Sequence, residues 1–174
     1  ISENDAVAAE ISSFQLMSMN APVEAAVITN ITPNHLNWHT GMDEYISAKT
    51  TLLQNCKRAV LNYGCDITRN IGKNLTVPVT YFSSGEIDLA DIKGEDTAIF
   101  PENGIICEYK NHGEYRRELM SLKEILLPGL HNAENYMAAI GAVGSIVNLS
   151  SVRETAASFG GVKHRLEPVC TKKG

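Results

Sequence analysis

The sequence has few of the features that mark membrane proteins or nucleic-acid-binding proteins. No apolar run approaches the roughly 20 residues of a membrane-spanning helix, and no charged segment leads into an apolar one at the start. We therefore expect no membrane partner and no signal peptide. The net charge of −5 at pH 7 gives no support to nucleic acid or an anionic membrane surface as a partner.

Cysteine is also scarce, and its spacing matches no common redox or zinc motif. The chain has four cysteines, which lie far apart and form no C-x-x-C pair. The simplest interpretation is free thiols in a reducing compartment. We therefore expect a cytoplasmic protein.

Several motifs of catalysis and nucleotide binding are missing as well. The chain contains no G-x-G-x-x-G and no G-x-x-x-x-G-K-[ST]. Ser12 and Ser13 lack the flanking glycines of a nucleophile elbow. We find no internal repeat. The chain therefore has none of the motifs that would identify a reaction by themselves.

What is present is the composition of a globular protein with a core of ordinary size. The 174 residues amount to about one domain, with 44% apolar and 20% charged residues. Apolar runs predict strands and helical spacing predicts helices, in the order strand 6–9, strand 24–31, helix 42–55, strand 58–62, helix 66–73 capped by Asp66, and strand 76–82. This alternation predicts an α/β fold with a mostly parallel sheet and flanking helices.

The pattern changes between residues 85 and 127. Two apolar runs, at 97–100 and 105–108, flank Asn103-Gly104, which is typical of a type I′ hairpin. We expect a small antiparallel β subregion here, within one domain that spans the whole chain.

Two helices are expected after this subregion. The first has Asn132 as its N-cap and continues to about Val147, with apolar residues on one face. The second is capped by Ser150 or Ser151 and ends near Phe159.

The stretch at 30–39 (NITPNHLNWH) is the centre of the candidate site. It follows an apolar strand pattern, and its proline and asparagines predict a loop at the C-terminal end of that strand, where open α/β sheets bind ligands. The helix that follows carries Lys49 on or beside its apolar stripe, although lysine is rarely buried. Either Lys49 keeps its ammonium in water, or it points into the same site as His35.

Three other groups are candidates on residue type alone. Glu10 ends a short apolar run and is either a Mg²⁺ ligand or a solvated strand end. His35 and His39 have the i, i+4 spacing of a zinc pair, but no third ligand lies close by, and a zinc-binding domain is the weakest alternative. The basic residues 163–165 suit either a phosphate or an exposed turn.

The combination of motifs resembles the central domain of the Mur ligases over nearly the whole chain. The matching motifs occur in the family's order: EISSFQL at 10–16, NITPNHLNWH at 30–39, YISAK at 45–49, LHNAENYMAA at 130–139 and GVKHRLE at 161–167. The SSFQL form is most similar to the members that add D-glutamate to UDP-N-acetylmuramoyl-L-alanine. Another Mur ligase or a folylpolyglutamate synthase-like ligase is the alternative within the class.

The resemblance implies an ATP-dependent ligase that forms a peptide bond through an acyl phosphate. Glu10 and His35 would bind two Mg²⁺ ions. Lys49 would be carbamylated by CO₂, which turns a cation that repels Mg²⁺ into an anion that can bind it. Lys49 and His35 are thus the implied catalytic residues.

The same resemblance implies the substrate contacts. Ser12 would lie beside the muramoyl-peptide substrate. Asn132 and Asn135 would face the adenine of ATP, and Arg165 would contact the nucleotide.

The resemblance also implies that parts of the family's machinery are absent from the 174 residues. These parts are the phosphate-binding loop, the N-terminal uridine-binding domain and the C-terminal domain. We therefore expect the chain to be inactive alone, with weak ATP binding, and we expect self-association through an exposed sheet edge as one outcome. A non-catalytic domain that has kept only the fold is the alternative from another class.

Overall fold

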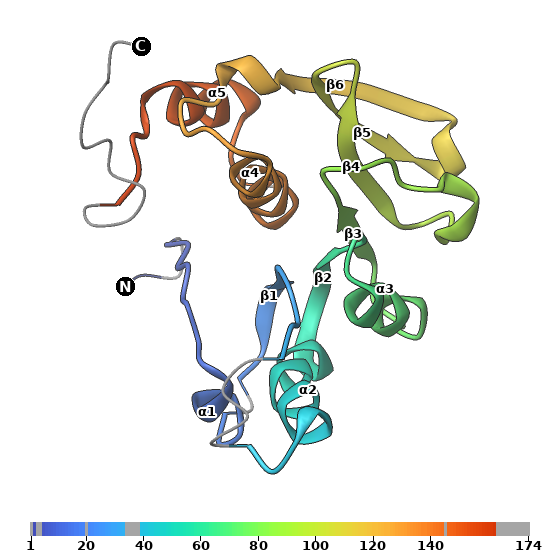
Figure 1. The fold of residues 1–174 in the computed structure, drawn as a ribbon, viewed down its shortest axis with the longest axis vertical. Helices are drawn as coiled ribbons and strands as arrows, with labels where there is room; N and C mark the ends of the chain where they lie inside the picture. The colour runs from blue at the N-terminus through green and yellow to red at the C-terminus, as the bar shows by residue number, and fades with distance from the viewer. Residues whose placement is uncertain (1, 3–4, 20, 34–38, 145, 163–174) are drawn as a thin grey trace, which may run out of the picture.

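The computed structural model describes residues 2, 5–19, 21–33, 39–144 and 146–162, and its centre is a six-stranded sheet (Figure 1). The strands follow one another in chain order: β1 (Val23–Ile28), β2 (Cys56–Asn62), β3 (Val79–Phe82), β4 (Thr97–Glu102), β5 (Ile105–Lys110) and β6 (Tyr115–Ser121). Strands β1 to β4 pair in parallel, and β4 to β6 pair antiparallel. The predicted fold class is confirmed.

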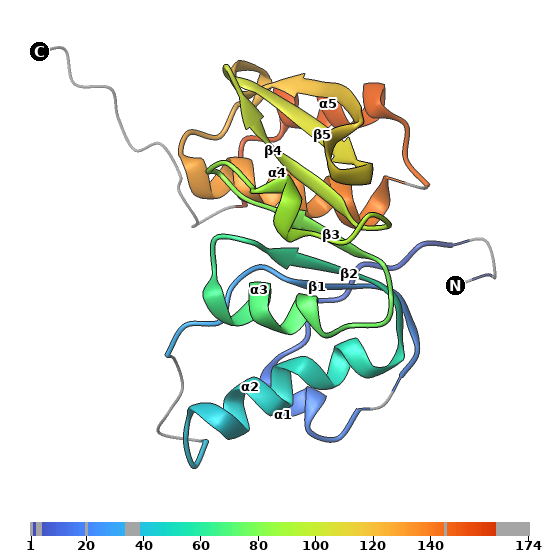
Figure 2. The ribbon, with the colours of Figure 1, turned by 90° about the vertical axis from the view of Figure 1, so that its right-hand side faces the viewer.

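Helices cover both faces of this sheet (Figures 1 and 2). The α-helices are α1 (Ser13–Leu16), α2 (Met42–Thr50), α3 (Asp66–Lys73), α4 (Leu130–Val143) and α5 (Leu149–Ser158). Short 3₁₀ segments are η1 (Thr51–Asn55), η2 (Leu89–Asp91), η3 (Asn111–Gly113) and η4 (Leu122–Glu124). Helices α2 and α3 pack on one face, and α4 and α5 on the other. No helix among the described residues is long and apolar enough to cross a membrane.

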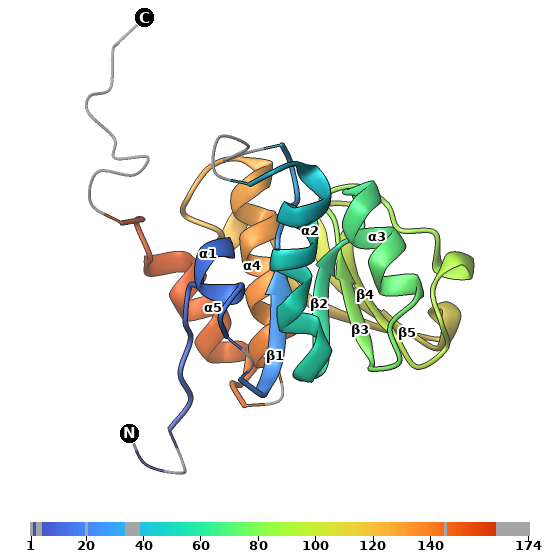
Figure 3. The same cartoon turned by 90° about the horizontal axis from the view of Figure 1, so that it is seen from below.

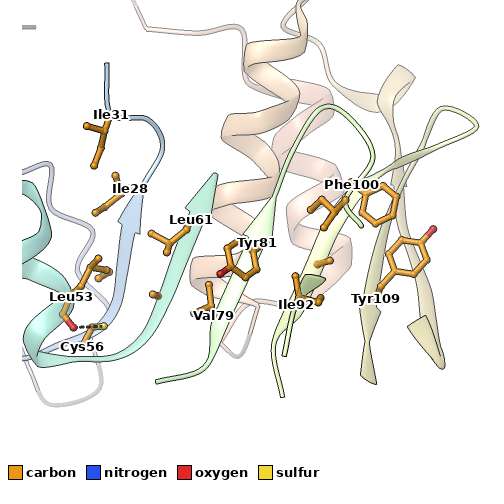
Figure 4. Close-up of a cluster of buried hydrophobic side chains, with 14 of the residues drawn as sticks. Ile28, Ile31, Leu53, Cys56, Leu61, Val79, Tyr81, Ile92, Phe100 and Tyr109 are labelled. Atoms are coloured by element: carbon orange, nitrogen blue, oxygen red, sulfur yellow. Dashed lines mark hydrogen bonds between the residues drawn. The ribbon is translucent and has the colours of Figure 1, made fainter. Parts of the chain in front are cut away.

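The two faces of the sheet are apolar because successive strand residues point to opposite sides. On β2, Leu61 belongs to the core beneath α2 and α3, whereas its neighbour Val60 belongs to the core beneath α4. On β3, Tyr81 belongs to the core beneath α2 and α3, and Phe82 belongs to the core beneath α4. Figure 4 shows Leu61, Tyr81 and Phe100 aligned on one face across three strands. This continuous burial explains why the strands are apolar runs rather than alternating patterns.

The antiparallel strands continue the main sheet. The β4–β5 turn is made by Asn103 (φ 51°) and Gly104 (φ 80°), the two positive φ angles of a type I′ turn, as the sequence predicts. Strand β4 also pairs in parallel with β3, so the antiparallel strands extend the sheet rather than forming a separate layer. In Figure 3 the strands follow one another across the molecule from β1 to β5.

The predicted strand at 6–9 is wrong. Residues 5–10 are in no strand, and their side chains are exposed. Three of the four residues at 6–9 are alanines, which have low strand propensity and bury little surface. Among the described residues β1 pairs only with β2, so this run has no neighbouring strand.

Helix α4 begins and ends earlier than predicted. Its N-cap is Gly129, not Asn132. Glycine suits this position because its φ is +108° and a Cβ there would lie 2.7 Å from the His131 ring. Asn132 is the third residue of the helix. The helix ends at Val143, before Gly144, rather than at Val147.

Two further caps differ from prediction. Cys65, not Asp66, is the N-cap of α3, and Asp66 is the first helical residue. Asn148, not a serine, caps α5, and its side-chain oxygen accepts the Ser151 N–H at 2.9 Å. Asparagine caps as well as serine does, so sequence alone does not decide between adjacent candidates. The predicted end of α5 near Phe159 is confirmed.

Candidate functional site

The candidate site lies where the parallel strands end and α4 begins. Glu134, in the first turns of α4, accepts hydrogen bonds from the Ser84 backbone N–H (3.1 Å) and hydroxyl (2.7 Å), just beyond the end of β3. This contact fixes the N-terminus of α4 at the C-terminal edge of the sheet. Ligands bind at this edge in open α/β sheets, and a helix N-terminus there favours anions.

Two of the residues predicted to bind the nucleotide lie on α4 near this edge. Asn132 is buried, and its Nδ2 donates to the Pro128 carbonyl at 2.7 Å. The amide is therefore held in one orientation. Asn135, one turn further on, is exposed. The two side chains differ in exposure, and of the two only Asn132 has a side-chain hydrogen bond within the described residues.

Ser12 and Glu10 lie in the segment that leads into α1. Ser12 is the N-cap of α1, in a reciprocal capping box with Gln15: Gln15 N–H donates to Ser12 Oγ, and Ser12 N–H donates to Gln15 Oε1 at 2.9 Å. The Ser12 side chain is exposed. Glu10 is exposed as well, and lies outside any strand. Both are accessible to a ligand.

A buried polar group connects α1 to the start of α2. His39 is 4% exposed, and its Nε2 is hydrogen-bonded to Ser13 Oγ at 3.0 Å. Its ring stacks on Phe14 with centroids 5.0 Å apart and lies 5.3 Å from the Tyr45 ring. Its Nδ1 lies 3.9 Å from Glu44 Oε2. Thr40 donates backbone and hydroxyl hydrogen bonds to Glu44, which lowers the pKa of the Glu44 carboxyl.

Lys49 lies near the end of α2 and is half-buried. Its Nζ is 5.3 Å from the Tyr45 ring centroid, a cation–π contact. No ion pair to Lys49 is found in the part of the chain that the structure describes. Tyr45 therefore contacts both Lys49 and His39.

Two predicted site residues, His35 and Arg165, lie outside the described residues. The zinc interpretation rests on His35 and His39, and His39 already bonds Ser13 through Nε2. Within the described ranges no group of three His, Cys, Asp or Glu side chains could hold a metal ion.

The contacts of Ser13, Ser84 and Glu134 do not follow from the sequence pattern. Ser13 and His39 are 26 positions apart, and Ser84 and Glu134 are 50 apart, so no local pattern pairs them. The one local signal was the S-x-x-Q capping box that begins at Ser12.

Parallel strands that end at a helix N-terminus define an α/β domain whose candidate ligand site is this edge. The particular family follows from sequence. The Mur ligase middle domain model matches residues 2–143, and the chain belongs to the Mur ligase family. The family resemblance predicted from the motifs is confirmed.

Named relatives are similar over almost the whole chain. A UDP-N-acetylmuramoylalanine--D-glutamate ligase of Clostridium perfringens is 37% identical over 170 residues, covering 96% of this chain and 34% of the relative. One of Acetivibrio thermocellus is 37% identical over 173 residues, covering 97% and 35%. The chain thus spans about a third of the length of these curated relatives.

Solved structures confirm the fold. A pseudomurein peptide ligase type C from Methanothermus fervidus has a TM-score of 0.60 at 17% identity, covering 91% of this chain and 38% of that one. The UDP-N-acetylmuramate-alanine ligase of Thermotoga maritima has a TM-score of 0.57 at 22% identity, covering 87% and 32%.

Proposed function

We propose that this chain is the central domain of an ATP-dependent ligase that adds D-glutamate to UDP-N-acetylmuramoyl-L-alanine in peptidoglycan precursor synthesis. The observation that carries the proposal is the 37% identity, over nearly all of the chain, to relatives of that name. The SSFQL segment at 12–16, which forms α1 and its N-cap, supports the same assignment. The full-length protein would act in the cytoplasm.

The reaction proceeds through an acyl phosphate. ATP phosphorylates the terminal carboxylate of UDP-N-acetylmuramoyl-L-alanine, forming an O–P bond and releasing ADP. The amine of D-glutamate then attacks the acyl carbon, the amide C–N bond forms, and phosphate leaves with loss of the amine proton. Ser12 contacts the muramoyl substrate, while Asn132, Asn135 and Arg165 hold the nucleotide.

The residue types fit Mg²⁺, which takes oxygen ligands and keeps several waters and substrate phosphates. Such a site needs only one or two protein ligands, so the lack of a three-residue cluster among the described residues does not conflict with it. Glu10, with His35, would hold the two ions, and Glu10 is exposed and available. Bound Mg²⁺ would neutralise charge on the phosphates.

Lys49 fits the proposed carbamate. It is half-buried beside an aromatic ring and has no ion pair within the described ranges. The ammonium first loses one proton; the neutral amine then forms an N–C bond between Nζ and CO₂ and loses a second proton, which leaves a carbamate anion in place of the ammonium. A cation at this position would repel Mg²⁺, whereas the carbamate would attract it.

The test is a ligation assay on the full-length protein with ATP, UDP-N-acetylmuramoyl-L-alanine and D-glutamate. Phosphate release should need both substrates. It should fall about a hundredfold or more in Lys49→Ala and in His35→Ala, because each removes a group that stabilises transition-state charge. Lys57→Ala is the matched control, since Lys57 makes only an exposed ion pair with Glu24 and should change turnover little.

Other outcomes would revise the proposal. Turnover with a different amino acid would keep the chemistry and change the substrate. A well-folded full-length protein with no turnover on any acceptor would favour the non-catalytic alternative. The 174 residues alone should show no ligation and weak ATP binding, and an ATPase signal lost in Glu10→Ala would contradict that expectation.

A further inference from the structure

Helix α1 is too short to be stable without tertiary contacts. It has four residues, a single turn, and isolated helices shorter than about 12 residues are marginal in water. Its capping box satisfies its own backbone but does not fix its position. That position depends on the side chains that pack against neighbouring elements, and α1 lies against α2 (Figure 2).

His39 supplies the polar part of this packing. The hydrogen bond between its ring and the Ser13 hydroxyl and the stack on Phe14 hold two consecutive residues of α1. Tyr45 packs against the same ring from α2, on the side that carries Lys49. A single buried ring therefore joins the segment of Ser12 to the helix of Lys49.

Glu44 lies beside the other nitrogen of the His39 ring. Its carboxylate faces His39 Nδ1 at 3.9 Å, and that nitrogen is buried without a hydrogen-bond partner among the described residues. A proton on Nδ1 directs the ring dipole toward the carboxylate and leaves Nε2 to accept the Ser13 hydroxyl hydrogen.

The order carboxylate, imidazole, serine resembles a hydrolase triad, but it cannot serve as one here. Ser13 is only 6% exposed, so its hydroxyl is not presented to a substrate. The distance from Nδ1 to Glu44 is also too long for a hydrogen bond. The arrangement can hold a segment in place but cannot present a nucleophile.

We propose that His39 is a positioning residue of this ligase. Through Ser13 and Phe14 it fixes α1, and with it Ser12, relative to the helix that carries Lys49. The identity of the substrate beside Ser12 rests on the proposed function. The positioning itself rests on the contacts of His39.

The experiment uses the full-length protein with three variants. Ser13→Ala removes the hydroxyl, and His39→Phe keeps a ring for stacking but removes the hydrogen bond. His39→Gln keeps a polar atom near the position of Nε2. The matched control is Thr68→Val, which removes a fully buried hydroxyl that donates to the carbonyls of Asn62 and Cys65, away from α1.

Two readouts separate positioning from simple destabilisation. The KM for UDP-N-acetylmuramoyl-L-alanine should rise about tenfold in Ser13→Ala and His39→Phe, the effect expected for one lost hydrogen bond, while the KM for ATP stays the same. Hydrogen exchange at the Leu16 and Met17 amides, which bond the carbonyls of Ser12 and Ser13, should speed up by a similar factor. His39→Gln should recover part of both effects, and Thr68→Val should show neither.

Each outcome decides one question. If Leu16 and Met17 exchange as slowly as in Thr68→Val and the KM values do not separate, the positioning role is overturned. If the unmodified protein does not use the muramoyl substrate, the proposed function fails. Faster exchange confined to the Ser13 and His39 variants would still support the positioning role in that case.

Discussion

At the scale of single residues, Asp96 links stability to pH. It is 2% exposed, and its Oδ1 accepts the Val79 backbone N–H at 2.8 Å at the start of β3. Burial raises the pKa of this carboxyl above its ordinary value, against the opposing effect of the Val79 hydrogen bond. Between the ordinary and the raised pKa the folded state binds more protons than the unfolded state, so stability falls as pH rises through this range.

We therefore expect Asp96→Asn to remove this fall. The amide oxygen can still accept the Val79 N–H, but no charge has to be buried. The free energy of unfolding of the variant, measured by urea titration at a series of pH values, should increase relative to that of the original chain as pH rises toward neutrality. Glu95→Gln, which removes an exposed carboxylate next to Asp96, is the comparison. The Glu95 charge also raises the Asp96 pKa, but less than burial does, so this variant should show a smaller effect of the same sign, and an equal effect would refute the role of burial.

At the scale of elements, α3 can approach the sheet only because residue 72 is glycine. A Cβ there would lie 2.8 Å from Tyr81 Cζ and 3.0 Å from Leu61 Cδ1, and both side chains are buried. In an exposed helix, alanine would be the better residue by about 1 kcal/mol, but overpacking a core costs about 1–3 kcal/mol.

Gly72→Ala should accordingly lower the free energy of unfolding by about 1 kcal/mol, as measured by urea denaturation. Gly160→Ala is the matched control, because no atom lies within 4 Å of a Cβ built there. A Gly72→Ala variant at least as stable as the original chain would mean that Tyr81 can move aside.

The elements predicted correctly from sequence are those whose signals are local. The helix at 66–73 and the Asn103-Gly104 hairpin follow from periodicity and turn chemistry, and both are found. The alanine-rich run at 6–9 has strand-like apolarity, but a strand also needs a partner, which composition does not reveal. The cap at Gly129 depends on a backbone angle, and the Ser13–His39 contact depends on tertiary folding, so neither follows from a local pattern.

At the scale of the whole molecule, the two edges of the sheet differ in protection. Strand β6 carries the charged residues Arg116, Arg117 and Glu118 along one edge, a common defence against edge-to-edge pairing. Strand β1, at the other edge, has Glu24 as its only charge. We expect the 174-residue chain to self-associate through β1.

Sedimentation velocity should then show a mass that rises above 19.0 kDa with concentration. Ala25→Lys, on β1, should restore the monomer, whereas Tyr115→Lys, on β6, should leave association unchanged. A chain that stays monomeric at all concentrations, or responds equally to both substitutions, would exclude pairing through β1.

The mixed sheet has a consequence for the order of folding. Strands β4, β5 and β6 are joined by short turns, so their pairing closes small loops, whereas each parallel pair from β1 to β4 requires a long crossover first. The hairpin at Asn103-Gly104 can form within microseconds and present β4 as a template for β3. We therefore expect the antiparallel end of the sheet to form first and the parallel strands β1 to β3 to join it later.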